Sequence, residues 1–500
     1  MSARRSKIKR RDFLKGMSAA PLMAAAARLP APPAEPLPDG ELVNDVHTGL
    51  NPTWVSKVVR PTSSAEVESI VKDCRKRGIA LSISGSRHAA GGQQFLANSL
   101  LLDMRSMNRV VELDARTGVL HVEAGIEWPE LIQGYLDLQK SEPLWGIRQK
   151  QGGADRMTLG GTIAANAHGH CLGAAPIVGD LEWIEVVTPD GTAKRCTRNE
   201  NKGLFALAVG GYGLFGVITA AGLRLVPRRK LRRHVETRTT AEVAALIAKR
   251  TSAGDPYGYF QYSIDETSPD FLRNGILTTY EPVKPETPLT PEAADIDPRL
   301  LTALLELAHK DRGSAYRRYA KIELAKDGTV EWSDLHQLST YVPGYHADIE
   351  KRLDPGSEGA DVILEVYVPP RDLIPFLEDA RRILLAAELP LVYGVIRFVE
   401  QDKETFLAWA KKRYACVIFM LHTSRETKAL QRTADTCRQL MRGATRRSGG
   451  FYLTYNRFAT RDDLFRAYPQ FAAFLAMKRQ HDPLDTLQSE WYRHYKALYS

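Results

Sequence analysis

The strongest constraint on the fold is a set of three separate blocks of very small residues. The blocks read "SGSRHAAGG" (84–92), "LGGTIAANAHGH" (159–170) and "GGYGLFG" (210–216). Glycine weakens a helix or strand interior by about 0.5–1 kcal/mol relative to alanine, so this density favours neither element. Glycine-rich turns after strands instead let backbone N–H groups approach an anion closely. The blocks therefore predict a binding surface for a phosphate-bearing ligand.

Two common phosphate-binding motifs do not fit the first block. It lacks the lysine-and-hydroxyl ending of a P-loop, and it lacks the GxGxxG spacing of a nicotinamide-binding Rossmann turn. The ligand is therefore expected to bear phosphate but to be bound by neither of these motifs.

The positive charge is concentrated at the N-terminus. Residues 1–28 hold eight Lys/Arg and one Asp, which is +7 of the formal net charge of +9. The remaining chain is nearly neutral, so we expect no nucleic-acid partner.

The same N-terminal segment resembles a twin-arginine export signal. Arg10 and Arg11 are followed by Phe13, Leu14 and Lys15, and then by an alanine-rich run. A charged, disordered N-terminus is the alternative interpretation. The run is too short and too rich in alanine for a stable membrane span. We therefore expect residues 1–35 to be a signal and linker, the twin-arginine translocase to be a partner, and the mature protein to be periplasmic or otherwise exported.

The cysteines give no metal-binding pattern. Cys74, Cys171, Cys196, Cys416 and Cys437 are scattered, and no CxxC pair or His/Cys cluster has metal-ligand spacing. No metal is expected, and the sequence leaves disulfide pairing open.

Element signals change near residue 229. Before it, a strand at 55–60, a helix ended by Gly78 and a strand at 79–84 form a βαβ rhythm, with a further helix at 128–138. After it, helical patterns alternate with strand-like runs, which favours a separate α+β domain. The expected helices are 240–251, 297–325, 371–387 and 403–412, and the expected strands are 257–264, 361–368, 391–399 and 416–423.

Five blocks together resemble the vanillyl-alcohol oxidase superfamily of FAD-dependent oxidoreductases. They are "VVRPTSSAEVESIVKDCRKRGIALSISGSRHAAGGQ", "LGGTIAANAHGH", "VVTPDG", "AVGGYGLFGVIT" and "KRQHDPLDTL". The second block and the short C-terminal tail are most similar to the alditol, aldonolactone and decaprenylphosphoryl-ribose oxidase branch. The resemblance covers residues 50–228 and 450–490.

The resemblance implies an α+β fold and FAD as the cofactor. A two-subdomain PCMH-type FAD-binding domain is expected at 36–228, an α+β substrate (cap) domain with an antiparallel sheet at 229–450, and a C-terminal segment returning to the FAD domain at 451–500. The implied cofactor-binding residues are Ser84, Gly85, Ser86, Arg87, His88, Ala89, Gly91, Gly92, Gln93, Gly160, Gly161, Thr162, Ala164, Ala165, Gly169, Gly213, Gly216, Val217 and Ile218.

His88 stands where many members of the superfamily attach FAD covalently through a ring nitrogen. The alternative is a histidine that only hydrogen-bonds phosphate or backbone. Some relatives add a second link from a cysteine just ahead of the second block, but "RMTLGG" has none. The resemblance therefore implies a single covalent attachment.

Three residues are candidates for catalysis by the same resemblance. Arg397 matches an arginine that contacts substrate in polyol oxidases, although a snorkelling surface arginine is the alternative. His168 matches a histidine beside the flavin, and anchoring a loop is its alternative role. Asn456 stands where relatives carry a lysine, and Val395 where they carry a glutamate, so a less polar substrate or another orientation is expected. Tyr367, Tyr393 and Tyr455 are candidates for the pocket wall or for plain core.

These observations predict an exported FAD-dependent oxidase or dehydrogenase. It is expected to transfer hydride from an alcohol carbon of a sugar, lactone, polyol or lipid-linked substrate to flavin N5. The expected electron acceptor is O₂ or a quinone or cytochrome. A flavin-dependent C=C reductase or desaturase, or a flavin-binding protein without turnover, is the alternative.

Overall fold

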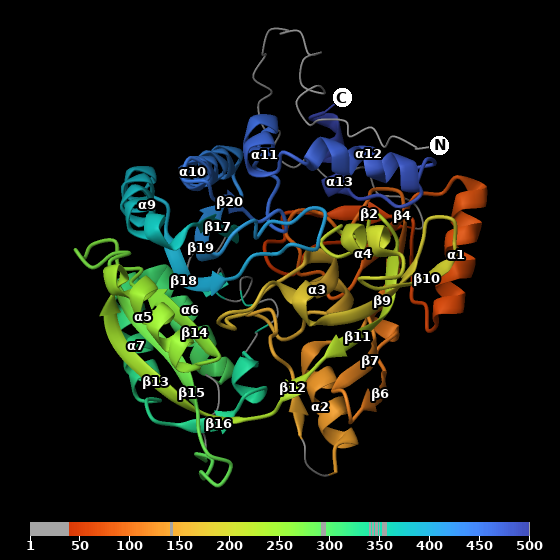
Figure 1. Cartoon of the computed structure of the whole chain (residues 1–500). Helices are drawn as coiled ribbons and strands as arrows, with labels where there is room; N and C mark the ends of the chain where they lie inside the picture. The colour runs from red at the N-terminus through yellow and green to blue at the C-terminus, as the bar shows by residue number, and fades with distance from the viewer. Residues whose placement is uncertain are drawn as a thin grey trace, which may run out of the picture.

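The computed structural model describes residues 40–140, 144–291, 297–339 and 358–499, together with Val342, Tyr345, Ile349, Lys351 and Arg352. The expected signal and linker at 1–35 lie outside the described residues. Figure 1 shows two lobes: residues up to about 228 (red to yellow) form one, and residues 230–450 (green to blue) form most of the other.

The first lobe begins with the predicted βαβ unit. Helix α1 (Ser64–Arg77) starts where the Ser63 side chain accepts from the Glu66 N–H, and ends at Gly78 in a left-handed conformation with φ 66°. It connects β3 (Lys57–Val59) to β4 (Leu81–Ser84). Both strands pair in parallel with β5 (Leu100–Asp103), which lies between them.

A five-stranded antiparallel sheet forms the rest of the first lobe, in the order β10-β9-β11-β7-β6. Three helices and two short strand pairs accompany it. The strands are β6 (Val110–Asp114), β7 (Val119–Glu123), β9 (Leu181–Val187), β10 (Ala193–Cys196) and β11 (Val217–Arg224); the helices are α2 (Trp128–Leu138), α3 (Leu159–Ala165) and α4 (Lys202–Ala208); the pairs are β1 (Glu41–Val43) with β2 (Thr53–Val55) and β8 (Trp145–Gly146) with β12 (Val226–Pro227).

The second lobe is built on one eight-stranded sheet, in the order β16-β13-β15-β14-β18-β19-β17-β20, whose pairs are antiparallel. Its strands are β13 (Lys230–Thr239), β14 (Tyr257–Tyr262), β15 (Asn274–Pro282), β16 (Val330–Trp332), β17 (Gly359–Val368), β18 (Leu391–Val399), β19 (Tyr414–Ser424) and β20 (Gly450–Phe451); its helices are α5 (Thr240–Ala253), α6 (Pro298–Lys310), α7 (Arg312–Leu324), α9 (Leu373–Ala387) and α10 (Thr427–Thr445).

The register of β17 and β19 sets up one functional face of this sheet. Because strand side chains alternate, residues two apart share a face. On that face Asp361 stands opposite His422, and Glu365 stands opposite Ile418. Ile418 is in turn opposite Val395 of β18.

The C-terminal segment packs on the first lobe. It carries α11 (Arg461–Ala467), α12 (Phe471–His481) and α13 (Glu490–Ala497). Figure 1 shows α12 and α13 in blue above that lobe, whereas α11 lies beside α10 of the second lobe. The Leu81 N–H donates to the Thr486 carbonyl at 2.7 Å, and the Trp491 N–H donates to the Gly92 carbonyl at 3.2 Å. This segment therefore supports β4 and the first glycine-rich block directly.

The α+β class and the antiparallel sheet are confirmed, and two element predictions are corrected. The pattern at 297–325 forms two helices, α6 and α7, separated at Asp311. The helix expected at 403–412 is wrong: that stretch is irregular, and tertiary hydrogen bonds fix it instead. The Phe406 N–H donates to the Ala206 carbonyl, and Trp409 Nε1 donates to the Asn166 carbonyl.

Two further findings concern membranes and cysteines. Among the described residues, no helix combines the length and apolar character needed to cross a bilayer. All five cysteines are buried and free of disulfides.

Candidate active site

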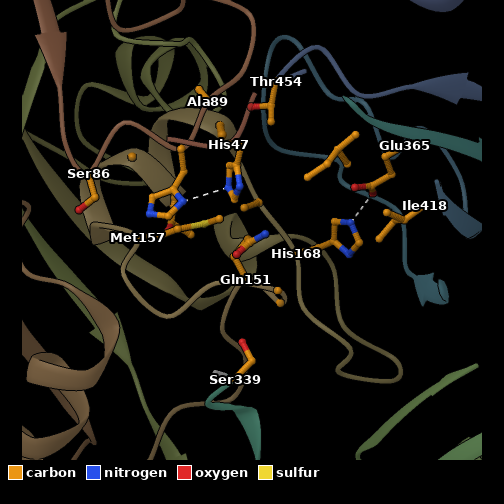
Figure 2. Close-up of a pocket in the computed structure, with 18 of the residues that line it drawn as sticks. His47, Ser86, Ala89, Gln151, Met157, His168, Ser339, Glu365, Ile418 and Thr454 are labelled. Atoms are coloured by element: carbon orange, nitrogen blue, oxygen red, sulfur yellow. Dashed lines mark hydrogen bonds and ion pairs between the residues drawn. The ribbon is translucent and has the colours of Figure 1, made fainter. Parts of the chain in front are cut away.

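A cavity of about 480 Å³ is lined by residues of both lobes. Its walls come from the three glycine-rich blocks, from the 151–158 loop and from the β17, β18 and β19 face. Figure 2 shows His47 and the His168–Glu365 pair on opposite sides of this pocket.

Most of the predicted cofactor-binding residues line this cavity. They are Ser84, Gly85, Ser86, Arg87, His88, Ala89, Gln93, Gly160, Gly161, Thr162, Ala164, Ala165, Gly213, Gly216 and Ile218. Three blocks that lie far apart in the sequence therefore meet in one place.

Four of the predicted positions do not line the cavity. Gly91 donates its N–H to Gln93 Oε1 at 3.0 Å. The Gly92 carbonyl accepts from Trp491, and a Cβ at Gly169 would lie 2.2 Å from the Lys150 carbonyl oxygen. Val217 is fully buried in β11. These four residues pack behind the cavity wall.

The cavity wall needs its small residues. A Cβ at Gly85 would lie 2.0 Å from Thr158 Oγ1, and one at Gly216, which has φ +152°, would lie 2.3 Å from Val186 Cγ1. Real Cβ contacts are not this short, so larger residues would displace neighbouring loops.

Free backbone donors face the same space. The N–H groups of Ser86, Arg87 and Ala89 donate to no group within the part of the chain that the structure describes. Arg87 also has a positive φ of 62°, which turns successive amides toward one side. Small residues and unpaired donors together fit a bound diphosphate.

His88 is held as a neutral imidazole. Its Nδ1 lies 3.0 Å from His47 Nε2, and its Nε2 lies 2.8 Å from the Arg156 carbonyl oxygen. Burial, followed by the nearby His47, lowers the pKa of His88 to about 3. Since a carbonyl only accepts, Nε2 carries the proton and Nδ1 presents a lone pair, toward which His47 donates.

A second polar pair joins the two lobes. His168 Nε2 lies 2.5 Å from Glu365 Oε1, and His168 Nδ1 lies 3.1 Å from the Gly169 carbonyl oxygen. Both side chains are 3% exposed. Because Nδ1 must donate to the carbonyl, the short contact holds one proton between Nε2 and the carboxylate. The second carboxylate oxygen, Oε2, accepts from Tyr455 at 3.4 Å.

Glu365 is a candidate functional residue that the sequence interpretation missed. Its signal is a charged residue in the centre of the apolar run "DVILEVYV", where a buried carboxylate requires a partner. It lies on the same sheet face as Val395, with Ile418 between them. A carboxylate therefore lies on this face two strands away from position 395.

Arg397 lies in the same cavity and is 8% exposed. Its Nε is buried and has no hydrogen-bond partner among the residues that the structure describes. A Cβ at Gly152 would lie 2.5 Å from its Nη2, so the guanidinium packs directly on the Gly152 backbone. No ion pair of Arg397 occurs within the described ranges, which leaves a buried cation facing the cavity. The snorkelling alternative does not apply.

Asn456 is not brought together with His168 and Arg397. It lies in an irregular segment after β20, does not line the cavity, and its Oδ1 is buried without a partner. Tyr393 and Tyr455 line the cavity, whereas Tyr367 stacks on Trp409 at 4.5 Å in the core.

The cap side of the cavity is polar and aromatic. Arg233 is paired with Glu323 and also donates to the Tyr259 hydroxyl at 3.1 Å. His170 lies 5.3 Å from His336, centroid to centroid, and its Nε2 is buried without a partner. Burial lowers the pKa of both histidines, that of His336 to about 3.

One buried group of side chains has the residue types of a metal site but contains a protonated thiol. His168, Glu365 and Cys416 place ligand atoms within 4.8 Å of one another. Burial raises the pKa of the Cys416 thiol well above its usual value, so the thiol stays protonated. A thiol of this kind does not favour metal binding.

We call the three glycine-rich blocks that line the cavity (84–92, 159–170 and 210–216) the cradle. Comparison with known proteins agrees with a role in cofactor binding. Residues 55–197 match the protein family described as an FAD binding domain. An uncharacterized oxidoreductase of Rhodococcoides fascians is 30% identical over 34% of this chain and 37% of its own length. L-gulono-1,4-lactone dehydrogenase of Mycobacterium tuberculosis is 26% identical over 41% of this chain and 46% of its length.

A third relative, the mitochondrial D-2-hydroxyglutarate dehydrogenase of Rattus norvegicus, is 32% identical over 35% of this chain and 33% of its length. The matched region thus spans less than half the length of these curated relatives. The chain thus matches an FAD binding domain over residues 55–197 and is similar to oxidoreductases over part of its length.

Proposed function

We propose that this protein is an FAD-dependent oxidoreductase that oxidises a CH–OH group of a sugar, lactone, polyol or lipid-linked alcohol. The observation that carries the proposal is the meeting of three features in one cavity. They are the glycine-rich cradle, the His168–Glu365 pair and the unpaired cation of Arg397. The two dehydrogenase relatives named above agree with this chemistry.

The cradle would hold the cofactor through backbone and small side chains. The amides of Ser86, Arg87 and Ala89 would donate to the diphosphate, and Ala164 and Ala165 would leave room for the ring system. When bound, FAD supplies the two-electron acceptor for the reaction.

A covalent link through His88 is part of the proposal. The lone pair on His88 Nδ1 is fixed by the tautomer, and the neutral state required of a nucleophilic imidazole is favoured by its pKa of about 3. His47 orients the ring by hydrogen bonding to that same nitrogen.

Glu365 would receive the proton of the substrate hydroxyl. Among the described residues, its Oε2 has only the long contact to Tyr455, whereas Oε1 is occupied by His168. His168 fixes the carboxylate and stabilises its negative charge, so it is the positioning partner of the base. Arg397 would bind a polar oxygen of the substrate or stabilise negative charge that develops beside it.

Export is the remaining part of the proposal. The paired arginines at 10 and 11 and the alanine-rich run support translocation by the twin-arginine pathway, with a periplasmic or otherwise external location. The acceptor would be O₂ or a quinone or cytochrome.

A substrate screen tests the proposal. The purified protein is mixed anaerobically with a panel of sugars, aldonolactones, polyols and 2-hydroxy acids, and flavin absorbance is followed. We expect one class of alcohol to bleach the flavin and Glu365→Gln to prevent the bleaching. Bleaching by NADPH alone, or by none of the alcohols, would contradict the proposal. Peroxide counted per reduced flavin in air then separates an oxidase from a dehydrogenase.

A further inference from the structure

A second cluster of polar side chains lies on the sheet face that carries Glu365, at the other end of that face. It consists of Asp361 on β17, His422 on β19 and His309 on α6. Asp361 and His422 are cross-strand partners, and α6 brings His309 to the same place. Asp361 is four residues from Glu365, which is about 13 Å along a strand. The cluster is therefore separate from the proposed catalytic pair.

The distances match those between ligands of one metal ion. His309 Nε2 lies 3.3 Å from Asp361 Oδ1, and His422 Nδ1 lies 2.8 Å from the same oxygen. All three ligand atoms lie within 4.8 Å of one another. With metal–ligand bonds of about 2.0–2.1 Å, neighbouring ligands stand about 2.9 Å apart in octahedral and about 3.4 Å apart in tetrahedral geometry.

The tautomer of His309 is fixed by a backbone contact. Its Nδ1 lies 2.7 Å from the Leu305 carbonyl oxygen, so Nδ1 carries a proton and donates it there. A neutral His309 then points the lone pair of Nε2 at the Asp361 carboxylate. Two acceptors at 3.3 Å repel unless a proton or a cation lies between them. Donation of the second ring N–H to a carbonyl is also the usual arrangement of a metal-binding histidine.

The surroundings of Asp361 leave an entry path and orient its carboxylate. The Asp361 and His309 side chains are 1% and 4% exposed, whereas His422 is 29% exposed, which leaves an entry path. The Tyr345 hydroxyl donates to Asp361 Oδ2 at 2.8 Å, which orients the carboxylate so that Oδ1 faces both imidazoles.

The geometry points to a binding site for one divalent transition metal of the Zn²⁺ class, held by His309 Nε2, Asp361 Oδ1 and His422 Nδ1. Two imidazoles and one carboxylate suit Zn²⁺, Co²⁺, Ni²⁺ or Fe²⁺, and they do not suit Ca²⁺ or Mg²⁺, which prefer oxygen ligands. On binding, His422 carries its ring proton on Nε2, the nitrogen remote from Asp361. The ion fastens α6 to the sheet, next to Tyr345, which lines the cavity.

Metal content measures this site without any assay of turnover. The full chain, with affinity tag removed, is stripped with chelator, equilibrated with Zn²⁺ by dialysis and counted by mass spectrometry of the metal. We expect about one tightly held Zn²⁺ per chain. We expect Asp361→Asn and His422→Ala each to weaken Zn²⁺ binding by at least about 10-fold. X-ray absorption at the zinc edge should show nitrogen and oxygen ligands only.

The matched control is His234→Ala, which removes a histidine that is about as exposed as His422 and also pairs with a carboxylate, Glu281, at 3.0 Å. It should keep the bound Zn²⁺. His422→Ala is the variant of lower folding risk because this side chain is partly exposed, and circular dichroism verifies its fold. Absence of Zn²⁺ binding by the wild-type chain would show a protonated His309–Asp361 ion pair and overturn the proposal. Unchanged binding in folded His422→Ala would overturn it equally.

Discussion

His168 Nε2 and Glu365 Oε1 lie 2.5 Å apart in a buried contact between the second glycine-rich block and strand β17. The contact joins the two lobes at the point where the cradle meets the eight-stranded sheet.

The carboxylate of Glu365 is the proposed base. Glu365→Gln keeps the shape but loses the base, so kcat should fall by roughly 10²–10⁴-fold.

The flavin content of Glu365→Gln should stay at the wild-type level, because Glu365 lies outside the cradle loops. A second control is Glu281→Gln, which changes an exposed glutamate and should leave kcat unchanged. Stopped-flow reduction of the flavin measures the effect directly. A Glu365→Gln protein that is reduced at the wild-type rate would exclude Glu365 as the base.

Arg397 should act on substrate rather than on stability. Its guanidinium is buried and has an unpartnered Nε, so replacement by Gln removes a charged donor without breaking an ion pair. We expect kcat/KM to fall by about 10- to 100-fold, the usual effect of losing one hydrogen bond to a charged group. Arg273→Gln removes an exposed pair with Glu378 and should have little effect. Equal kinetics for the two variants would argue against a role for Arg397.

Glycine replacements separate the cradle from the rest of the fold. A Cβ at Gly85 would meet the Thr158 side chain at 2.0 Å, and Thr158 caps α3. Gly85→Ala should therefore lower the flavin bound per chain. Gly203→Ala in α4 meets nothing within 4 Å and should stabilise the protein by up to about 0.5–1 kcal/mol. Flavin absorbance and denaturant unfolding measure both outcomes, and full flavin occupancy in Gly85→Ala would contradict the packing argument.

Acid should destabilise the protein through its buried histidines. Burial, followed by the positive charge of Arg233, lowers the pKa of His336 from 6.5 to about 3. Between these values the unfolded chain binds more protons than the folded chain, so the free energy of unfolding falls as pH drops from 6.5 toward 3. Burial raises the pKa of Asp180 from 3.8 to about 6. Between these values the folded chain binds more protons at this group than the unfolded chain, so the contribution of Asp180 to the free energy of unfolding falls as pH rises.

His336→Gln isolates the histidine contribution. Urea unfolding of this variant and of the wild type at pH 7 and pH 5 should show a smaller loss of stability in the variant. An identical loss in both proteins would mean that His336 is not buried in its neutral form.

The sequence could predict local elements well where local signals decide them. The helix at 128–138 has the predicted bounds because an apolar period and a proline near its start agree. The stretch at 403–412 shows the opposite case. Its composition favours a helix, but contacts to Ala206 and Asn166 from distant segments fix an irregular path.

The glycine-rich cradle could be predicted from the sequence, whereas most of the polar side chains on the face of the eight-stranded sheet could not. Glycines in three blocks mark a close approach of backbone without knowledge of the fold. Glu365 becomes visible only when strand register places it beside His168, which precedes it by 197 residues. The His309, Asp361 and His422 cluster likewise depends on α6 crossing the end of β17 and β19, so no spacing in the sequence reveals it.

We propose that three glycine-rich loops form a cradle for FAD with His88 attached to it. The direct measurement is the visible spectrum and intact mass of the mature chain, purified and then denatured in acid. We expect about one flavin per chain that stays with the denatured protein and is released, or absent, in His88→Ala. A colourless chain that takes up no FAD on incubation would rule out an FAD site at these loops.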